Sequence, residues 1–187
     1  PILFAWLSHR TAIRLAEHKR RLELMSTRDG MTGVFNRRHW ETLLRNEFEA
    51  CRRSHRQATI LLIDIDHFKT INDTWGHDVG DEAIVAITRQ LQLTLRSGDY
   101  IGRFGGDEFA VIMSGTPADS AIAAMSRVHE RLVNMPLHGA PMARLCISVG
   151  VAPWGAQFTH YREWLKAADV ALYKAKNAGR GRTEVAA

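Results

Sequence analysis

Two short acidic stretches hold the residue types in this chain that could do chemistry. One is the Gly-Gly-Asp-Glu sequence at residues 105–108, which lies between two apolar runs typical of strands. A Gly-Gly pair favours a hairpin turn because both residues tolerate positive φ, and the missing side chains let a bulky ligand approach the backbone. The other is the Asp-Ile-Asp sequence at residues 64–66, which ends a short apolar run at 59–63. Alone, the hairpin is equally compatible with an ordinary surface turn.

Carboxylates at the end of a buried strand are typical of a site for a hard cation with oxygen ligands. Asp64 and Asp66 are expected to point to the same face because side chains alternate along a strand. Asp64 favours such a site, because a carboxylate at the end of a buried strand costs folding free energy unless it has a partner. Asp66 has an equal alternative as the N-cap of a helical segment at 68–75. The N-terminus of that segment and Lys69 favour phosphate binding beside the cation.

Hydrophobic periodicity predicts the elements that must position these acids. We expect helices after Asn36 as an N-cap and at 81–96, 117–134 and 161–177, and strands at 59–63, 100–104, 109–113, 145–152 and 183–185. The pairs Glu41–Arg45 and Glu49–Arg53 are expected on the outer face of the helix after Asn36.

This order of elements indicates an α/β sandwich: a ferredoxin-like βαββαβ core with a mostly antiparallel central sheet flanked by helices. In such a sheet the 105–108 hairpin can lie beside the 59–63 strand. Its two acids would then approach Asp64, and acids on two adjacent elements are the ingredients of a two-metal site for nucleotidyl transfer.

Composition limits the function classes. The chain has 187 residues, of which 45% are hydrophobic, and a net charge of +5. This length allows one domain of about 150 residues plus an appendage. The basic excess is concentrated in the first 38 residues and the aromatic residues mostly fall at core spacings, which argues against a nucleic-acid binder. The two cysteines lie outside any metal-ligand spacing and indicate a reducing compartment.

Residues 1–26 are expected to form a membrane-proximal linker helix ahead of a folded domain at 27–187. Residues 1–7 are apolar, and a strongly basic stretch follows. Two interpretations remain open: the end of a truncated transmembrane segment with a positive flank, or a soluble amphipathic helix. Trp6 followed by several Arg and Lys residues favours the first.

Four motifs in this order resemble the GGDEF family of diguanylate cyclases: residues 29–38, residues 64–81, Gly-Gly-Asp-Glu-Phe at 105–109, and residues 171–180. Met31 stands where leucine is usual in the family. The resemblance covers residues 27–185 and implies the fold of nucleotidyl cyclases and polymerase palm domains. The N-terminal segment resembles the junction with a membrane sensor domain in AdrA-type cyclases. This implies a cytoplasmic catalytic domain in a protein of the bacterial inner membrane.

The resemblance implies that two GTP molecules are condensed into cyclic di-GMP and two pyrophosphates. Asp64, the carbonyl of Ile65 and Asp107 would hold two Mg²⁺ or Mn²⁺ ions in each half-site. Glu108 would assist metal binding or deprotonation of the 3′-hydroxyl. Lys69 would bind the phosphates next to these acids and belongs to the same catalytic set.

The resemblance also implies a GTP site. Asn72 and Asp81 would select guanine, because an amide and a carboxylate complement its hydrogen-bonding edge. Helix capping is the alternative for Asp81. The remaining contacts to the nucleotide, through the backbone or through cationic side chains, would come from Phe68, Lys69, Gly105, Gly106, Lys176 and Arg180. For the last two, interaction with a helix dipole is the alternative.

Arg96 and Asp99 match the family's product-inhibition motif, with Arg127 as a further contact to cyclic di-GMP. Asp29 and Arg103 are expected to form a salt bridge between the N-terminal loop and the hairpin. Because the product is two-fold symmetric, the resemblance implies an antiparallel homodimer. Two other functions remain as alternatives: a catalytically silent module that binds GTP or cyclic di-GMP, and a related cyclase or palm domain for another nucleotide.

Overall fold

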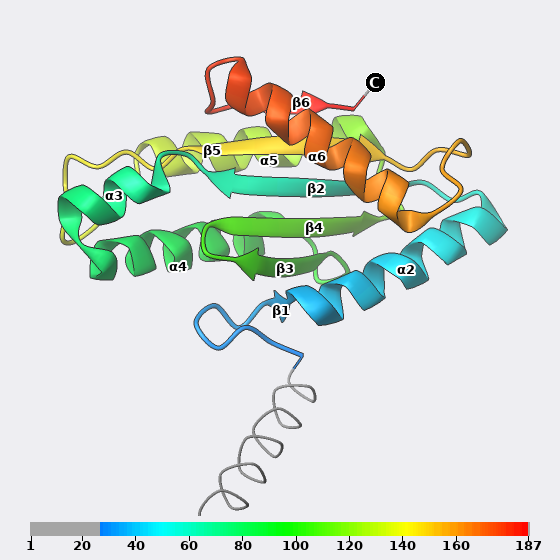
Figure 1. Ribbon diagram of the computed structural model, residues 1–187, viewed down its shortest axis with the longest axis horizontal. Coiled ribbons are helices and arrows are strands. Elements are labelled where there is room, and N and C mark those ends of the chain that lie inside the picture. Colours follow the sequence, from blue (N-terminus) through cyan, green and yellow to red (C-terminus); the bar gives the residue numbers. More distant parts are fainter. Residues whose placement is uncertain (1–26, 187) are drawn as a thin grey trace, which may run out of the picture.

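The computed structural model describes residues 27–186, so the expected linker helix and the apolar stretch at 1–7 lie outside the described residues. A six-stranded sheet forms the centre of the molecule, and helices pack on both of its faces (Figure 1). The strands are β1 (Phe35–Asn36), β2 (Ala58–Ile65), β3 (Tyr100–Gly105), β4 (Glu108–Ser114), β5 (Ile147–Pro153) and β6 (Thr183–Val185). The helices are α2 (Arg37–Ser54), α3 (Phe68–Trp75), α4 (His77–Thr94), α5 (Ala118–Val133) and α6 (Tyr161–Asn177).

The strand order is β1-β3-β4-β2-β5-β6. The outer pairs, β1–β3 and β5–β6, are parallel, and the pairs between them are antiparallel. Strands β3-β4-β2-β5 form the ferredoxin-like core, with α4 and α5 on one face and α2 and α6 on the other. The predicted fold class is therefore confirmed. Among residues 27–186, no helix has the length and hydropathy needed to cross a membrane.

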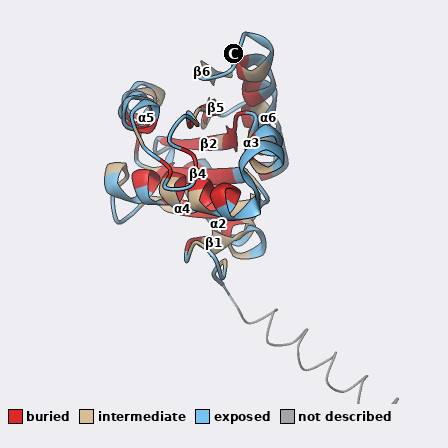
Figure 2. Cartoon of the chain, turned by 90° about the vertical axis from the view of Figure 1, so that its left-hand side faces the viewer, coloured by how far each residue is buried: buried red, intermediate tan, exposed pale blue. Residues whose placement is uncertain are grey.

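The two faces of the sheet carry side chains of different size. The bulky residues of β5, at positions 147, 149 and 151, belong to the core under α4 and α5. Its small residues face α6, which therefore approaches closely: a Cβ on Gly150 would lie 2.2 Å from the carbonyl oxygen of Ala168. Figure 2 shows the buried residues on the sheet and on the helix surfaces turned towards it. The predicted strand with one bulky and one small face is thus confirmed, although it begins at Ile147 and not at position 145.

The start of α4 differs from the prediction. Gly76 has a φ of 89°, ends α3 and serves as the N-cap of α4, so α4 begins at His77. Asp81 consequently lies inside α4, and its alternative role as a helix cap is wrong. The difference arises because one glycine ends the first helix and starts the second without an intervening loop.

The predictions for α2 are partly confirmed. The side chain of Asn36 accepts a hydrogen bond from His39 N and caps the helix as expected. The surface pairs differ, however, because Glu41 pairs with Arg37 and Glu49 pairs with Arg52. Strand β1 was not predicted; its two residues pair with β3 just before α2 begins.

Candidate active site

The end of β2 and the β3–β4 hairpin lie at the same edge of the sheet, where α3 follows β2 (Figure 1). Asp64 on β2 is the register partner of Glu108 on β4, so the two side chains stand on the same face of the sheet. One residue further, the N–H of Ile65 donates to the carbonyl oxygen of Asp107 over 3.2 Å. The structure therefore brings together the three acids that the sequence placed in two separate motifs.

Asp64 is buried and already has a cationic partner. Its Oδ2 atom lies 2.7 Å from Nζ of Lys176 in the last turn of α6. Burial raises the pKa of Asp64, and the neighbouring charges of Asp107 and Glu108 raise it further, against the opposite effect of Lys176. Because the net pKa shift is upwards, the ammonium group of Lys176 does not offset the combined effect of burial and the two neighbouring acids, of which burial is the larger. The site favours additional positive charge.

Both turn glycines of the hairpin adopt positive φ, 150° at Gly105 and 45° at Gly106. Arg103 holds this turn, since its Nε and Nη2 atoms donate to the Gly106 carbonyl over 3.1 and 2.8 Å. Its Nη1 atom donates to Asp29 Oδ1 over 3.2 Å, so the expected bridge to the N-terminal loop is present. Hydrogen bonds from Thr32 and Arg103 outweigh the effect of burial and lower the pKa of Asp29.

The first turn of α3 faces the same edge of the sheet. Its N–H groups have no acceptor within the helix, because the first turn of any α-helix leaves them unpaired. The N-cap residue, His67, adds no capping side-chain hydrogen bond and has a φ of 57°. Phe68 begins the helix, and Lys69 is exposed beside it. This turn therefore offers N–H groups and one ammonium group to an anion.

Asn72 and Asp81 lie on the packed pair α3 and α4. The Oδ1 atom of Asn72 is buried and has no hydrogen-bond partner among the described residues. Gly80 makes room for it: a Cβ on Gly80 would lie only 1.9 Å from Asn72 Oδ1 and 3.3 Å from Cζ of Phe68. An unpaired buried acceptor costs about 1–3 kcal/mol, so a ligand that donates a hydrogen bond to Asn72 Oδ1 would gain binding free energy. Asp81 follows Gly80 and is exposed.

Asp66 has its hydrogen-bond partners in distant parts of the chain. Its Oδ1 atom accepts a hydrogen bond from Ser148 Oγ at 2.7 Å, and its Oδ2 atom accepts one from Gly181 N at 2.8 Å. The N-cap of α3 is His67, so the capping interpretation of Asp66 is wrong. Both of its carboxylate oxygens are engaged inside the protein.

Lys176 and Arg180 are not on one helix face. Helix α6 ends at Asn177, and Arg180 lies in the following turn with a φ of 63°. Lys176 is in the last turn of α6 and Arg180 lies just beyond its C-terminus, so the alternative of an interaction with the helix dipole stays open for both.

The donor set at the sheet edge fits a small hard cation that also binds phosphate. No three His, Cys, Asp or Glu side chains within residues 27–186 are close enough to form a complete metal cage. Mg²⁺, however, is usually held by one or two carboxylates, with water and substrate phosphate completing its shell. Asp64 and Asp107 supply this kind of partial shell, and the ammonium group of Lys176 marks a position where positive charge is stabilised.

Arg96 and Asp99 line a surface pocket of about 380 Å³ together with Gln92 and Tyr100. The two residues close a tight turn, in which Arg96 N donates to Asp99 Oδ2 over 2.9 Å. Burial raises the pKa of Asp99, although the Arg96 N–H and charge act against this. Arg127 is exposed on α5, one turn before Arg131, whose Nη1 atom donates to Thr94 Oγ1 over 3.1 Å. The α5 arginines thus lie towards the end of α4 that leads into this pocket.

Three residues that support the site were not predicted from the sequence. Gly80 had no signal, because the predicted helix began at Asp81 and left this glycine outside it. Ser148 and Glu82 had none, because their partners are far away in the sequence. Glu82 accepts from His138 N over 2.9 Å and joins the loop after α5 to α4 beside Asp81. These hydrogen bonds, from the His138 N–H and its ring, lower the pKa of Glu82.

Comparison with known proteins agrees with these features. The sequence profile described as "Diguanylate cyclase, GGDEF domain" matches residues 26–182. The chain is 74% identical, over all 187 residues, to the probable diguanylate cyclase DgcC of Escherichia coli, and it covers 50% of that protein. It is 36% identical to the diguanylate cyclase DgcM of E. coli over 175 residues, which are 90% of this chain and 41% of DgcM. The chain thus spans about half or less of the length of these curated relatives.

Solved structures show the same fold. The GGDEF domain of DgcB from Caulobacter crescentus, determined in complex with c-di-GMP, superposes with a TM-score of 0.82 at 27% identity, covering 86% of this chain and 96% of that one. The diguanylate cyclase SiaD from Pseudomonas aeruginosa, in complex with its activator SiaC, gives a TM-score of 0.80 at 34% identity, covering 97% and 70% of the two chains. With the profile match across most of its length, the chain belongs to the GGDEF domain family of diguanylate cyclases.

Proposed function

We propose that this chain is the catalytic part of a diguanylate cyclase that joins two GTP molecules into cyclic di-GMP and releases two pyrophosphates. One observation carries the proposal: Asp64 and Glu108 are paired across β2 and β4, with Asp107 and Lys176 beside them. Family membership and the likeness to domains solved with c-di-GMP support it.

In this proposal, Asp64, the carbonyl of Ile65 and Asp107 hold two Mg²⁺ or Mn²⁺ ions in each half-site. When bound, the ions supply charge that lowers the pKa of the 3′-hydroxyl and stabilises the leaving pyrophosphate. Glu108 stands beside Asp64 and either takes part in metal binding or accepts the proton of the 3′-hydroxyl. Before substrate binds, Lys176 offsets part of the negative charge of Asp64.

GTP lies between the hairpin, α3 and the turn after α6. Its phosphates accept from the first N–H groups of α3, including that of Phe68, and from Lys69, Lys176 and Arg180. The open backbone at Gly105 and Gly106 lets the nucleotide lie over the hairpin. Asn72 and Asp81 pair with guanine, whereas adenine would leave these groups unpaired at a cost of about 1–3 kcal/mol.

Each protomer supplies one GTP half-site, and two protomers face each other antiparallel, because the product is two-fold symmetric. Residues 1–26 connect the catalytic domain at 27–187 to a membrane-inserted region of the whole protein in the bacterial inner membrane, and the catalytic domain is cytoplasmic. Cyclic di-GMP inhibits the enzyme by binding Arg96 and Asp99, with Arg127 as a further contact. The pocket beside Arg96 supports this site.

The direct test is to incubate the purified protein with GTP and Mg²⁺, separate the nucleotides, and repeat the incubation with ATP. The proposal predicts cyclic di-GMP from GTP and no cyclic dinucleotide from ATP. Binding of GTP or cyclic di-GMP without any turnover would instead establish the catalytically silent module. Equal turnover of ATP would contradict the guanine assignment of Asn72 and Asp81.

A further inference from the structure

Asp66 is a buried carboxylate to which the proposed chemistry gives no role. It follows Ile65 directly and is only 4% exposed. Its two oxygens are divided between distant parts of the chain: Ser148 on β5, which is fully buried, and Gly181, which follows α6. A buried carboxylate that receives two hydrogen bonds is well satisfied, so it has no need of a metal ion.

The segment that Asp66 holds is a tight turn with unusual backbone angles. The three residues at its centre all have positive φ: 112° at Gly179, 63° at Arg180 and 58° at Gly181. This region is ordinary for glycine but costs an arginine free energy, because its Cβ crowds the backbone. Arg180 therefore adopts this conformation only where neighbouring hydrogen bonds impose it.

The hydrogen bonds around the turn fix it on both sides of Arg180. Its own N–H donates to the carbonyl of Ala175 in α6 over 3.0 Å. After the turn, Val149 N donates to the Arg182 carbonyl over 2.9 Å and joins the chain to β5. The Gly181 N–H lies between these anchors, and its acceptor is Asp66.

Asp66 and Asp64 thus attach the end of α6 to the end of β2 at two points. Asp64 contacts Lys176, within the helix, and Asp66 contacts Gly181, beyond it. Both assigned phosphate-binding cations of this region, Lys176 and Arg180, are consequently tied to the strand that carries the metal-binding acid.

We propose that Asp66 is a positioning residue, which holds the Gly179–Gly181 turn in its left-handed conformation so that Arg180 is presented to the triphosphate of GTP. The inference rests on the proposed function, in which Arg180 binds phosphate. Asp66 acts as a hydrogen-bond acceptor for the backbone, and its negative charge is not required at the reacting atoms. A metal-ligand role for Asp66, by contrast, requires the carboxylate itself.

The two roles separate in Asp66→Asn. The amide oxygen still accepts from Gly181 N, and the amide nitrogen can donate to Ser148 Oγ, because a hydroxyl also accepts. Asp66→Ala removes both acceptors. Ser148→Ala is the matched control, since it removes a buried partner of Asp66 but leaves the bond to Gly181. Each variant is measured for kcat and KM with GTP, alone and combined with Arg180→Ala, and its melting temperature is recorded.

We expect Asp66→Ala to lower kcat/KM on the order of 10- to 100-fold, as for loss of a hydrogen bond to a charged group. Most of this loss is expected in KM. Asp66→Asn and Ser148→Ala are each expected to change kcat/KM by less than about threefold. In the Arg180→Ala background, Asp66→Ala is expected to add less than about threefold, because both substitutions remove the same contact.

A folded Asp66→Asn variant that loses activity as severely as Asp66→Ala would overturn the proposal in favour of a direct role for the carboxylate. Full additivity of Asp66→Ala and Arg180→Ala would also overturn it. If Asp66→Ala does not fold, the Asp66→Asn result still decides between the two roles. Failure of the proposed function is a different result, because the unsubstituted protein would then make no cyclic di-GMP.

Discussion

A single methyl group at Gly80 tests how the proposed guanine site is built. The Cβ of Gly80→Ala would lie 1.9 Å from Asn72 Oδ1 and 2.9 Å from its Cγ, so the Asn72 amide must move. The atom that must move is the end of a flexible side chain, so its displacement costs little folding free energy. Alanine is also about 1 kcal/mol more favourable than glycine inside a helix. We therefore expect the unfolding free energy to stay within about 1 kcal/mol of the original protein.

The expected loss is in function. In the proposed site, a displaced Asn72 would no longer pair with guanine, and one such hydrogen bond contributes about 0.5–1.5 kcal/mol. At about 1.4 kcal/mol for each factor of ten, kcat/KM for GTP should fall about 3- to 10-fold, and more if a guanine group is left unpaired. The assay compares Gly80→Ala, Asn72→Ala and the double variant in steady-state kinetics. Gly30→Ala is the control, because a Cβ there has no atom within 4 Å.

The double variant gives the clearest result. If Gly80 acts through Asn72, adding Gly80→Ala to Asn72→Ala should change kcat/KM by less than about twofold. The reasoning is refuted if Gly80→Ala keeps the original kcat/KM, or if its effect is the same in both backgrounds.

Three further substitutions test other parts of the site. In metal-free buffer, Asp64→Asn should raise the melting temperature at pH 7, because burial and neighbouring acids raise the pKa of Asp64. This gain should shrink as the pH falls through the raised pKa of the folded state and vanish below about 3, where the carboxyl is protonated in the folded and unfolded states alike; a gain that persists there would contradict this cause. Arg103→Lys keeps the charge but loses the paired bonds to the Gly106 carbonyl, so kcat should fall about tenfold, whereas unchanged kcat and stability would show that the hairpin needs no such anchor. Arg96→Ala should weaken inhibition by added cyclic di-GMP at least tenfold with similar initial rates, as measured by dose–response, and unaltered inhibition would remove this residue from the product site.

The parts of the site that the sequence predicted are those carried by local motifs. Asp64 and the hairpin acids could be brought together in advance because strand alternation and the ferredoxin-like order leave few arrangements. The start of α4 could not be predicted from the sequence. Gly76 joins two helices directly, where the hydrophobic pattern indicated one helix that begins at Asp81. With the observed start of α4 at His77, Asp81 lies in the second turn of the helix, next to Gly80, and not at the helix end.

The role of Asp66 depends on contacts that no local pattern encodes. Its partners Ser148 and Gly181 are 82 and 115 residues away in the sequence. A second acid two residues after Asp64 therefore predicted a second metal ligand or a cap, and both predictions use only neighbouring residues. Arg180 shows the same limitation, because its left-handed conformation belongs to a turn that is bonded to α6, to Asp66 and to β5.

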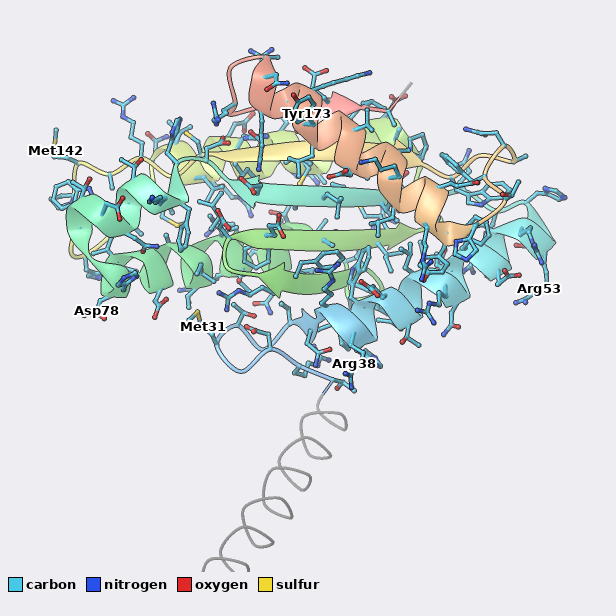
Figure 3. All side chains as sticks on the ribbon, viewed as in Figure 1. Met31, Arg38, Arg53, Asp78, Met142 and Tyr173 are labelled. Carbon is cyan, nitrogen blue, oxygen red and sulfur yellow. The ribbon has the colours of Figure 1, made fainter. Side chains whose placement is uncertain are left out.

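The spatial arrangement also clarifies how the N-terminal loop can influence the site. In Figure 3, Met31 lies in this loop below the sheet, at the opposite side from Tyr173 on α6. Arg103 connects the loop to the hairpin through Asp29 and Gly106. Arg103 therefore links the N-terminal loop directly to the turn that carries Asp107.

The most direct test of the central claim separates nucleotide binding from catalysis at the acidic edge. GTP binding and cyclic di-GMP synthesis are measured in parallel for the original protein, Asp107→Ala and Glu108→Ala, with Mg²⁺ present. The proposed site predicts that both variants fold and still bind GTP through α3, α4 and the turn after α6, but that neither makes cyclic di-GMP. Continued synthesis in both variants would contradict the assignment of this edge as the catalytic site.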